Sequence, residues 1–154
     1  MSEYITSDVK VIVFQLKNEE YGIPVQQVRS IEKIQHVTRV PRTASFIKGV
    51  INLRGVVTPI LDLRKRFGLE EIGYNESTRI IIVTINKIEA GLIVDAANDV
   101  LDIEKDLIEP APEVVGSIEV EYIQGVAKLD KRLIIMLELE SVLNSEEARS
   151  LQTI

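Results

Sequence analysis

The sequence contains no cysteine and no tryptophan, and it has a single histidine, His36. Without cysteine, the chain can form neither disulfides nor thiolate metal sites, and a cysteine nucleophile is excluded. One histidine leaves too few nitrogen ligands for a structural zinc site, and we interpret His36 as an ordinary surface residue. The absence of tryptophan removes the usual aromatic platform for binding sugars. We therefore predict no metal and no cofactor.

Basic residues and long hydrophobic runs are also scarce. Lys and Arg number 18 against 24 Asp and Glu, which gives a formal net charge of −6. A negatively charged surface repels nucleic acid and anionic lipid, so neither is an expected partner. The longest apolar runs, such as residues 9–14 and 80–83, are far shorter than the roughly 20 residues of a membrane helix. The polar N-terminus does not resemble a signal peptide, and we expect a cytoplasmic protein without membrane insertion.

Short β-rich segments make up most of the chain, and Gly, Pro, Asn, Asp or charged pairs separate them. Many short strands with turn signals between them are typical of small barrels or sandwiches. Helical patterns are brief, and the sequence predicts helices only over residues 24–31, 63–67, 96–101 and 141–151. The fold should therefore be mainly β, with short helices between strands and at the C-terminus.

The chain contains an internal repeat. Residues 13–31 align with residues 82–100 at an offset of 69, which places Gly22 on Gly91. Residues 46–67 align with 122–143 at an offset of 76, which places Gly49 on Gly125. β-rich chains can align by chance, but here the glycines and an aromatic residue match in order as well as the aliphatics. Repeated segments are typical of repeated structural modules.

The repeat predicts two pseudo-equivalent β-barrels of about 70 residues within one domain, residues 1–154. We place the first barrel at residues 9–70 and the second at residues 78–145, with room for a terminal strand or helix to cross over. Barrels this small have thin cores, so the two should pack side by side.

No catalytic motif can be found. The glycines do not form a phosphate loop or a dinucleotide fingerprint, and no serine lies in a nucleophile elbow. The acids between residues 95 and 109 lack the ligand spacing of a calcium loop. We predict a protein that is not an enzyme. The alternative is a small β-barrel enzyme or ligand-binding domain, which would need a polar concave pocket with converging titratable groups.

Two equivalent apolar segments are candidates for binding a partner. Pro24 suits the first position of a helix, and apolar residues follow it at a spacing of three. If the two barrels pack around a pseudo-two-fold axis, these segments could line an apolar groove that accepts an amphipathic helix. The alternative is that they belong to the barrel cores. The candidate residues are Val25, Val28, Arg29 and Ile31 in the first half and Ala97, Val100 and Leu101 in the second.

Arg54 is a candidate of a different kind. It precedes Gly55 between two apolar runs, in line with Asp130 of the second half, so we expect it in an exposed hairpin turn. An arginine on a rigid turn suits bidentate pairing with a carboxylate of a partner. The alternative is a solvated charge without a role.

Motifs throughout the chain resemble the CheW family of chemotaxis coupling proteins. They include FxLxxExYGI at residues 14–23, TRVP at 38–41, FIKGVINLRG at 46–55, PILDL at 59–63 and YIxGV at 122–126. The resemblance covers residues 9–145. It implies a fold of two SH3-like, five-stranded β-barrels and an adaptor without catalytic activity.

The same resemblance implies two partners. One is the regulatory domain of the histidine kinase CheA, and the other is the helical cytoplasmic tip of methyl-accepting chemoreceptors. The receptor would lie in the groove lined by the seven candidate residues of the two apolar segments. Coupling to the kinase would use Arg54 and, on the kinase-facing surface, Phe46, Ile47 and Ile51. We expect a monomer in isolation, because partners rather than self-contacts should cover the exposed apolar faces.

Overall fold

The computed structural model describes residues 8–110 and 120–143 of the chain. Its strands are β1 (Asp8–Leu16), β2 (Glu19–Pro24), β3 (Val28–Lys33), β4 (Ile47–Leu53), β5 (Val56–Asp62), β6 (Arg79–Ile85), β7 (Ile88–Val94), β8 (Ala96–Glu104), β9 (Ile108–Glu109), β10 (Ile123–Leu129) and β11 (Arg132–Leu137). The helices are short: α1 (Leu63–Arg66), α2 (Leu139–Val142) and the 3-10 turns η2 (Val25–Gln27), η3 (Lys105–Leu107) and η4 (Val120–Tyr122). The prediction of a mainly β fold is confirmed. Of the helix predicted over residues 141–151, positions 144–151 lie outside the described residues.

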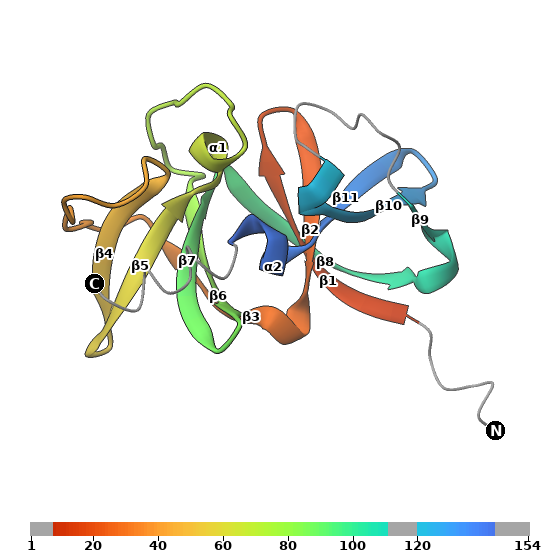
Figure 1. Cartoon of the computed structure of the whole chain (residues 1–154). Helices are drawn as coiled ribbons and strands as arrows, with labels where there is room; N and C mark the ends of the chain where they lie inside the picture. The colour runs from red at the N-terminus through yellow and green to blue at the C-terminus, as the bar shows by residue number, and fades with distance from the viewer. Residues whose placement is uncertain (1–7, 111–119, 144–154) are drawn as a thin grey trace.

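The strands form two mixed sheets that lie side by side (Figure 1). The first sheet has the order β8-β1-β2-β11-β10-β9, and the second has the order β3-β6-β7-β5-β4. Most neighbours are antiparallel, but β11 pairs with β2 and β5 pairs with β7 in parallel. The two sheets agree with two SH3-like barrels side by side. The first sheet has six strands because it includes the two-residue strand β9.

The sheets do not follow the division of the chain at residues 70–78, which corrects the expected assignment of strands to barrels. The hairpin β1–β2 of the first half lies in the sheet formed by β8 to β11, and the hairpin β6–β7 of the second half lies between β3 and β5 (Figure 1). Both halves therefore exchange a whole hairpin rather than one terminal element. A parallel pair joins each hairpin to its new sheet, Met136 beside Gly22 and Ile60 beside Gly91. The two pairs occupy equivalent positions in the repeats, because the offset of 69 places Gly22 on Gly91 and the offset of 76 places Ile60 on Met136.

The core lies mainly between the two sheets. The largest cluster of buried apolar side chains draws on both sheets and on α1 and α2, and it includes Phe14, Tyr21, Phe67, Ile81 and Leu92. A smaller cluster covers the opposite face of each sheet. A module of about 70 residues buries little apolar surface by itself. The shared core therefore explains why the two barrels pack together as one unit.

Asp95 connects the two sheets electrostatically. Its carboxylate accepts hydrogen bonds from Arg64 Nη2 at 2.6 Å and Nε at 2.8 Å, and from the Lys17 backbone N–H at 2.8 Å. Lys17 lies in the β1–β2 turn of one sheet, while Arg64 lies in α1 beside the other. The hydrogen bond to Asp95 raises the pKa of Arg64, against the lowering effect of burial. This contact fixes how the β1–β2 turn sits against α1.

Replacing Asp95 by asparagine should lower the free energy of unfolding by about 2 kcal/mol, because it leaves the largely buried Arg64 without its charged partner. Urea denaturation monitored by circular dichroism measures this loss. Asp102→Asn is the matched control, since the pair of Asp102 with Lys10 is well exposed at 3.8 Å and should contribute less than about 0.5 kcal/mol. Equal losses in both variants would contradict a connecting role for Asp95.

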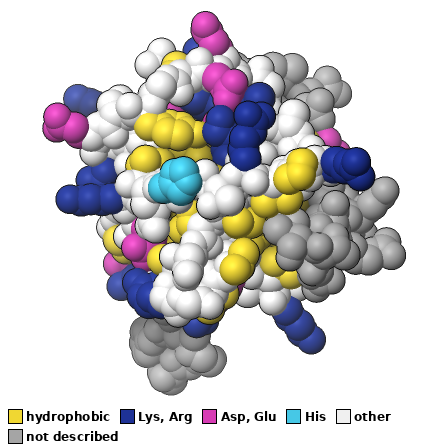
Figure 2. Space-filling view, turned by 90° about the vertical axis from the view of Figure 1, so that its left-hand side faces the viewer, with side chains coloured by type: hydrophobic (Ala, Val, Ile, Leu, Met, Phe, Trp, Pro, Cys, Tyr) yellow, Lys and Arg dark blue, Asp and Glu magenta, His cyan; other side chains and the backbone are white. Residues whose placement is uncertain are grey.

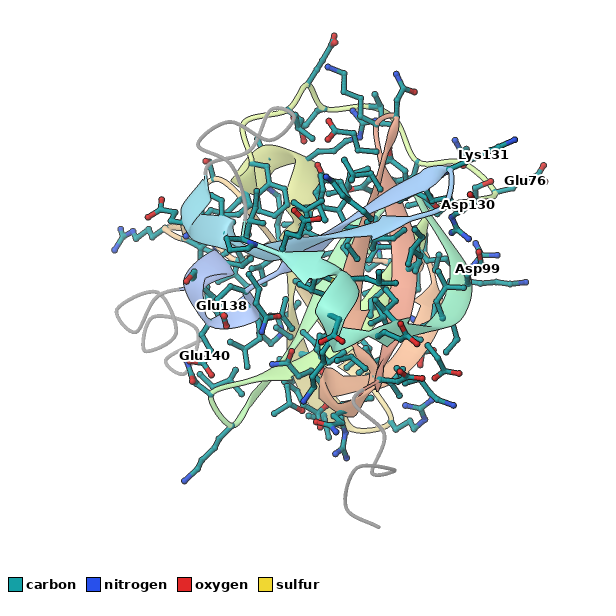
Figure 3. All side chains as sticks on the ribbon, turned by 90° about the vertical axis from the view of Figure 1, so that its right-hand side faces the viewer. Glu76, Asp99, Asp130, Lys131, Glu138 and Glu140 are labelled. Atoms are coloured by element: carbon teal, nitrogen blue, oxygen red, sulfur yellow. The ribbon has the colours of Figure 1, made fainter. Side chains whose placement is uncertain are left out.

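A second ionic contact joins three strands of the first sheet. Arg132 donates from Nε and Nη2 to the two carboxylate oxygens of Glu20, at 3.0 and 2.8 Å, and from Nη2 to Asp99 at 3.2 Å. These residues lie on β11, β2 and β8. Asp99 therefore lies close to the hairpin turn that carries Asp130 and Lys131 (Figure 3). The contact ties the edge strand β8 to β11 and β2, which lie beyond its neighbour β1 in the sheet.

Candidate functional site

The candidate receptor-binding segments lie on strands, not helices, which corrects the prediction for residues 24–31 and 96–101. Only Val25–Gln27 forms a 3-10 turn, and β3 and β8 are edge strands of their sheets. Each strand carries one residue that its partner strand does not match. In β3, Val28 pairs with Val83 and Ser30 with the next residue along the partner, Ile82, which leaves Arg29 unmatched. In β8, Ala97 pairs with Phe14 and Asp99 with Val13, which leaves position 98 unmatched. One extra residue in a strand is a β-bulge. The bulges produce the spacing of three from Val28 to Ile31 and from Ala97 to Val100, and the 3-10 turn produces it from Val25 to Val28.

The bulges place four candidate residues on the faces that meet the shared core. Directly opposed residues of antiparallel strands share a face. Val28 and Ile31 oppose Val83 and Ile81, and both partners belong to the shared core. Ala97 and Val100 oppose Phe14 and Ile12, which belong to it as well. The two repeats therefore present the same arrangement twice.

Burial separates these residues into two groups. Val25, Val28 and Ala97 are partly buried and pack against the shared core. Ile31 and Val100 remain 43% and 57% exposed. Exposed branched aliphatic side chains on an edge strand are a feature that soluble proteins usually avoid unless a partner covers them. An enclosed groove between the two segments stays a prediction, whereas the exposed pair is a property of the structure.

Arg29 and Leu101 lie elsewhere. Arg29 falls at the bulge of β3 and approaches Glu89 at 3.8 Å, in a shallow depression that also includes Arg54. Leu101 opposes Val11 and packs against the smaller cluster on the other face of its sheet. Five of the seven predicted receptor-binding residues are thus associated with the shared core, and these two are not.

Arg54 occupies the exposed turn that the sequence predicted. Leu53 pairs with Val56, and the two turn residues Arg54 and Gly55 have φ of 53° and 87°. Two consecutive positive φ values are typical of a type I′ hairpin turn, which favours glycine at its second position. The Asn52 side chain accepts a hydrogen bond from the Gly55 N–H at 2.8 Å and stabilises the turn. Arg54 Nη2 lies 3.3 Å from Glu32 on β3, and its side chain is largely exposed.

The predicted apolar kinase-facing residues are buried, which corrects their role. Phe46, Ile47 and Ile51 are 6%, 8% and 2% exposed, because Phe46 and Ile47 pack in the shared core and Ile51 packs on the opposite face of the second sheet.

Sequence reasoning missed Val56 and Val57, which are 54% and 62% exposed just after the Arg54–Gly55 turn. Two adjacent apolar residues in a strand point to opposite faces, so this pair was a signal that one side chain faces solvent.

The described part of the chain assembles no metal site. Within residues 8–110 and 120–143, no three His, Asp or Glu side chains come together as a metal site would require. The same residues contain no helix that is long and apolar enough to cross a membrane. The buried polar side chains Thr58, Asp62 and Thr78 lie in turns and strands, and the Asp62 carboxylate accepts a hydrogen bond from the Lys65 N–H at the start of α1.

Comparisons with known proteins give consistent results. The family model of the CheW-like domain matches residues 10–147. The chain is 46% identical over 150 residues to the chemotaxis protein CheW of Bacillus subtilis, covering 97% of this chain and 96% of that protein. It is 41% identical over 136 residues to the chemotaxis protein CheW of Klebsiella aerogenes, covering 88% and 82%. The crystal structure of the scaffolding protein TtCheW from Thermoanaerobacter tengcongensis aligns with a TM-score of 0.84 at 39% identity, covering 94% of this chain and 93% of that one.

Proposed function

Since the chain belongs to the CheW family, we propose that it is a cytoplasmic, non-catalytic chemotaxis adaptor that couples the histidine kinase CheA to the tips of chemoreceptors. One observation carries the receptor half of this proposal. Ile31 and Val100 occupy equivalent positions of the two repeats, on edge strands that border one shared core, and both are exposed. Paired apolar edges of this kind suit the apolar face of a helix, as in a receptor tip. Val25, Val28 and Ala97 would form the floor of that site.

The kinase half of the proposal rests on the β4–β5 hairpin. Arg54 and Val56 line one depression at this turn, Val57 points to the opposite face of β5, and all three side chains are exposed. Arginine is enriched in protein interfaces, and the exposed aliphatic side chains near it add apolar surface that a partner could cover. Arg54 pairs with Glu32 of β3, but β6 and β7 separate β5 from β3 in the sheet, and we propose that both partners bind at once. Tethering kinase and receptor to one small protein raises their effective concentration, and individual contacts can then be weak.

The experiment that tests the proposal is reconstitution from purified components. CheA and receptor-containing membranes are sedimented with increasing amounts of the protein, and kinase autophosphorylation is followed. We expect co-sedimentation of the kinase, and a rise in its activity, only when all three components are present. The protein should remain monomeric in isolation by sedimentation velocity. A folded sample that binds neither partner would refute the proposal and would favour the ligand-binding alternative.

Replacing Arg54 by alanine should reduce receptor-dependent kinase activation by about fivefold while the free energy of unfolding changes by less than about 0.5 kcal/mol. The Arg54 side chain is largely exposed, so its ion pair with Glu32 should contribute little to stability. Lys87→Ala is the matched control, because Lys87 also carries a positive charge at positive φ, 69°, in the β6–β7 turn. Unchanged activation by Arg54→Ala, measured in the reconstituted assay, would identify Arg54 as a solvated charge.

A further inference from the structure

A depression beside β4 is lined by four basic residues. Arg39 and Arg42 come from the segment between β3 and β4, Lys48 comes from β4, and Lys65 comes from α1. Figure 2 shows the face of the molecule that includes this side, where Lys and Arg side chains gather next to acidic ones. The chain as a whole carries a net charge of −6, so a group of four cations is a local reversal of sign. We call these four residues the basic depression.

The basic depression retains an excess of positive charge after its own contacts are counted. Glu71 pairs with Lys48 Nζ at 3.2 Å and with Lys65 Nζ at 3.5 Å. The hydrogen bond from Lys48 and the charges of both lysines lower the pKa of Glu71. This carboxylate is therefore ionised, and its single negative charge is shared between the two lysines. Within the described residues, Arg39 and Arg42 form no ion pair and no side-chain hydrogen bond. Two arginines are therefore available.

The backbone holds these arginines in place. Thr38 and Val50 exchange two hydrogen bonds of 2.8 Å, and the Asp62 N–H donates to Phe46 O at 2.8 Å, so the segment is fixed to β4 and β5 at both ends. Arg42 has a φ of 64°, a conformation that side-chain-bearing residues rarely adopt. The other described non-glycine residues with positive φ lie in two-residue hairpin turns, whereas Arg42 lies in a longer loop.

We infer that the basic depression binds an acidic segment of a partner protein, an extended stretch that carries two or more carboxylates. Arg39 and Arg42 can each pair with a carboxylate in bidentate geometry, and Val40 and Pro41 between them offer apolar contact for the peptide. Nucleic acid fits poorly, because the rest of the surface is acidic. A single inorganic anion would engage one or two of the four cations, whereas an extended segment with several carboxylates can reach all of them. This surface is a third one, apart from those assigned to receptor and kinase.

The test is titration of the full-length protein with a fluorescein-labelled hexaglutamate peptide, followed by anisotropy at low salt. We expect saturable binding that weakens as salt is added, because the contacts are solvent-exposed. The double substitution Arg39→Glu/Arg42→Glu should weaken binding by at least about tenfold. Arg42→Gly should weaken it by a smaller factor at unchanged melting temperature, since glycine readily adopts the φ of this position.

The matched control is Lys87→Glu/Lys131→Glu, which makes the same change of net charge at two exposed turns away from the depression. We expect its affinity to stay within about twofold of the unmodified protein. Three results would overturn the inference: no hexaglutamate binding, equal losses in the two double variants, or equal binding of hexaglutamine. Displacement of the peptide by inorganic phosphate, at a similar concentration, would identify a small-anion site instead and would overturn it too.

Discussion

Alanine at position 49 should cost the protein about 3 kcal/mol of its free energy of unfolding. Gly49 has a φ of 146°, and a Cβ atom built there would lie 2.0 Å from the carbonyl oxygen of Thr38. That oxygen is backbone, and it accepts the hydrogen bond of the Val50 N–H. Relief of the clash therefore requires the segment around Thr38 to leave β4. Urea denaturation measures the loss, and amide exchange at Thr38 and Val50 should become faster.

Gly73→Ala is the matched control, because no atom lies within 4 Å of the corresponding Cβ and the change should cost less than about 0.5 kcal/mol. Gly125→Ala tests the repeat, since its Cβ would lie 2.8 Å from the carbonyl oxygen of Glu109. We expect a destabilisation between those of the other two variants. A Gly49→Ala protein as stable as Gly73→Ala would show that the segment carrying Thr38 does not approach β4 as closely as the structure indicates.

The equivalence of Gly49 and Gly125 shows what the sequence could predict. The offset of 76 that aligns these glycines also aligns β4 with β10 and α1 with α2. In each repeat a second piece of backbone pairs beside the glycine, Thr38 with Val50 in one and Glu109 with Val126 in the other. Only glycine tolerates such an approach, so the repeated glycines were a reliable signal of a repeated structure.

Two aspects of the fold could not be predicted from local patterns. The exchange of hairpins depends on the parallel pairs β5–β7 and β2–β11, which join residues far apart in the chain. No local periodicity records such pairing. The bulges give Val28 and Ile31 in β3, and Ala97 and Val100 in β8, the spacing of a helix. Periodicity alone cannot distinguish a short helix from a bulged strand. The prediction of helices for these elements is therefore wrong, and the role of their apolar residues in binding stays a prediction.

Burial was the least predictable property of the candidate site. Phe46, Ile47 and Ile51 are apolar and lie in a motif shared with a known family, but both faces of β4 are covered, so none of them reaches the surface. Val56 and Val57 look like core residues in the sequence and are exposed because the hairpin extends beyond the sheet neighbours that would cover it. A contact residue is defined by what the tertiary structure leaves uncovered, and the sequence pattern does not contain that information.

The proposed division of the surface predicts opposite effects for two single substitutions. Val100→Glu should weaken binding to receptor tips by at least about tenfold and leave binding to CheA within about twofold, because an unpaired carboxylate would be buried against the receptor helix. Val57→Glu should do the reverse. Both side chains are more than half exposed, so neither change should lower the free energy of unfolding by more than about 0.5 kcal/mol. Val28→Glu would also weaken receptor binding, but Val28 packs against the shared core, and loss of stability would obscure the result.

Separate binding measurements, with soluble receptor-tip fragments and with the regulatory domain of CheA, distinguish the possible outcomes. Opposite losses in the two variants would assign the paired edges of β3 and β8 to the receptor and the β4–β5 hairpin to the kinase. Loss of both partners in one folded variant would mean that the two surfaces overlap, and an adaptor could not then hold both partners at once. An unchanged affinity in both variants would remove the exposed aliphatic pairs from either interface. The proposal requires the first outcome, because coupling without catalysis depends on simultaneous contact with both partners.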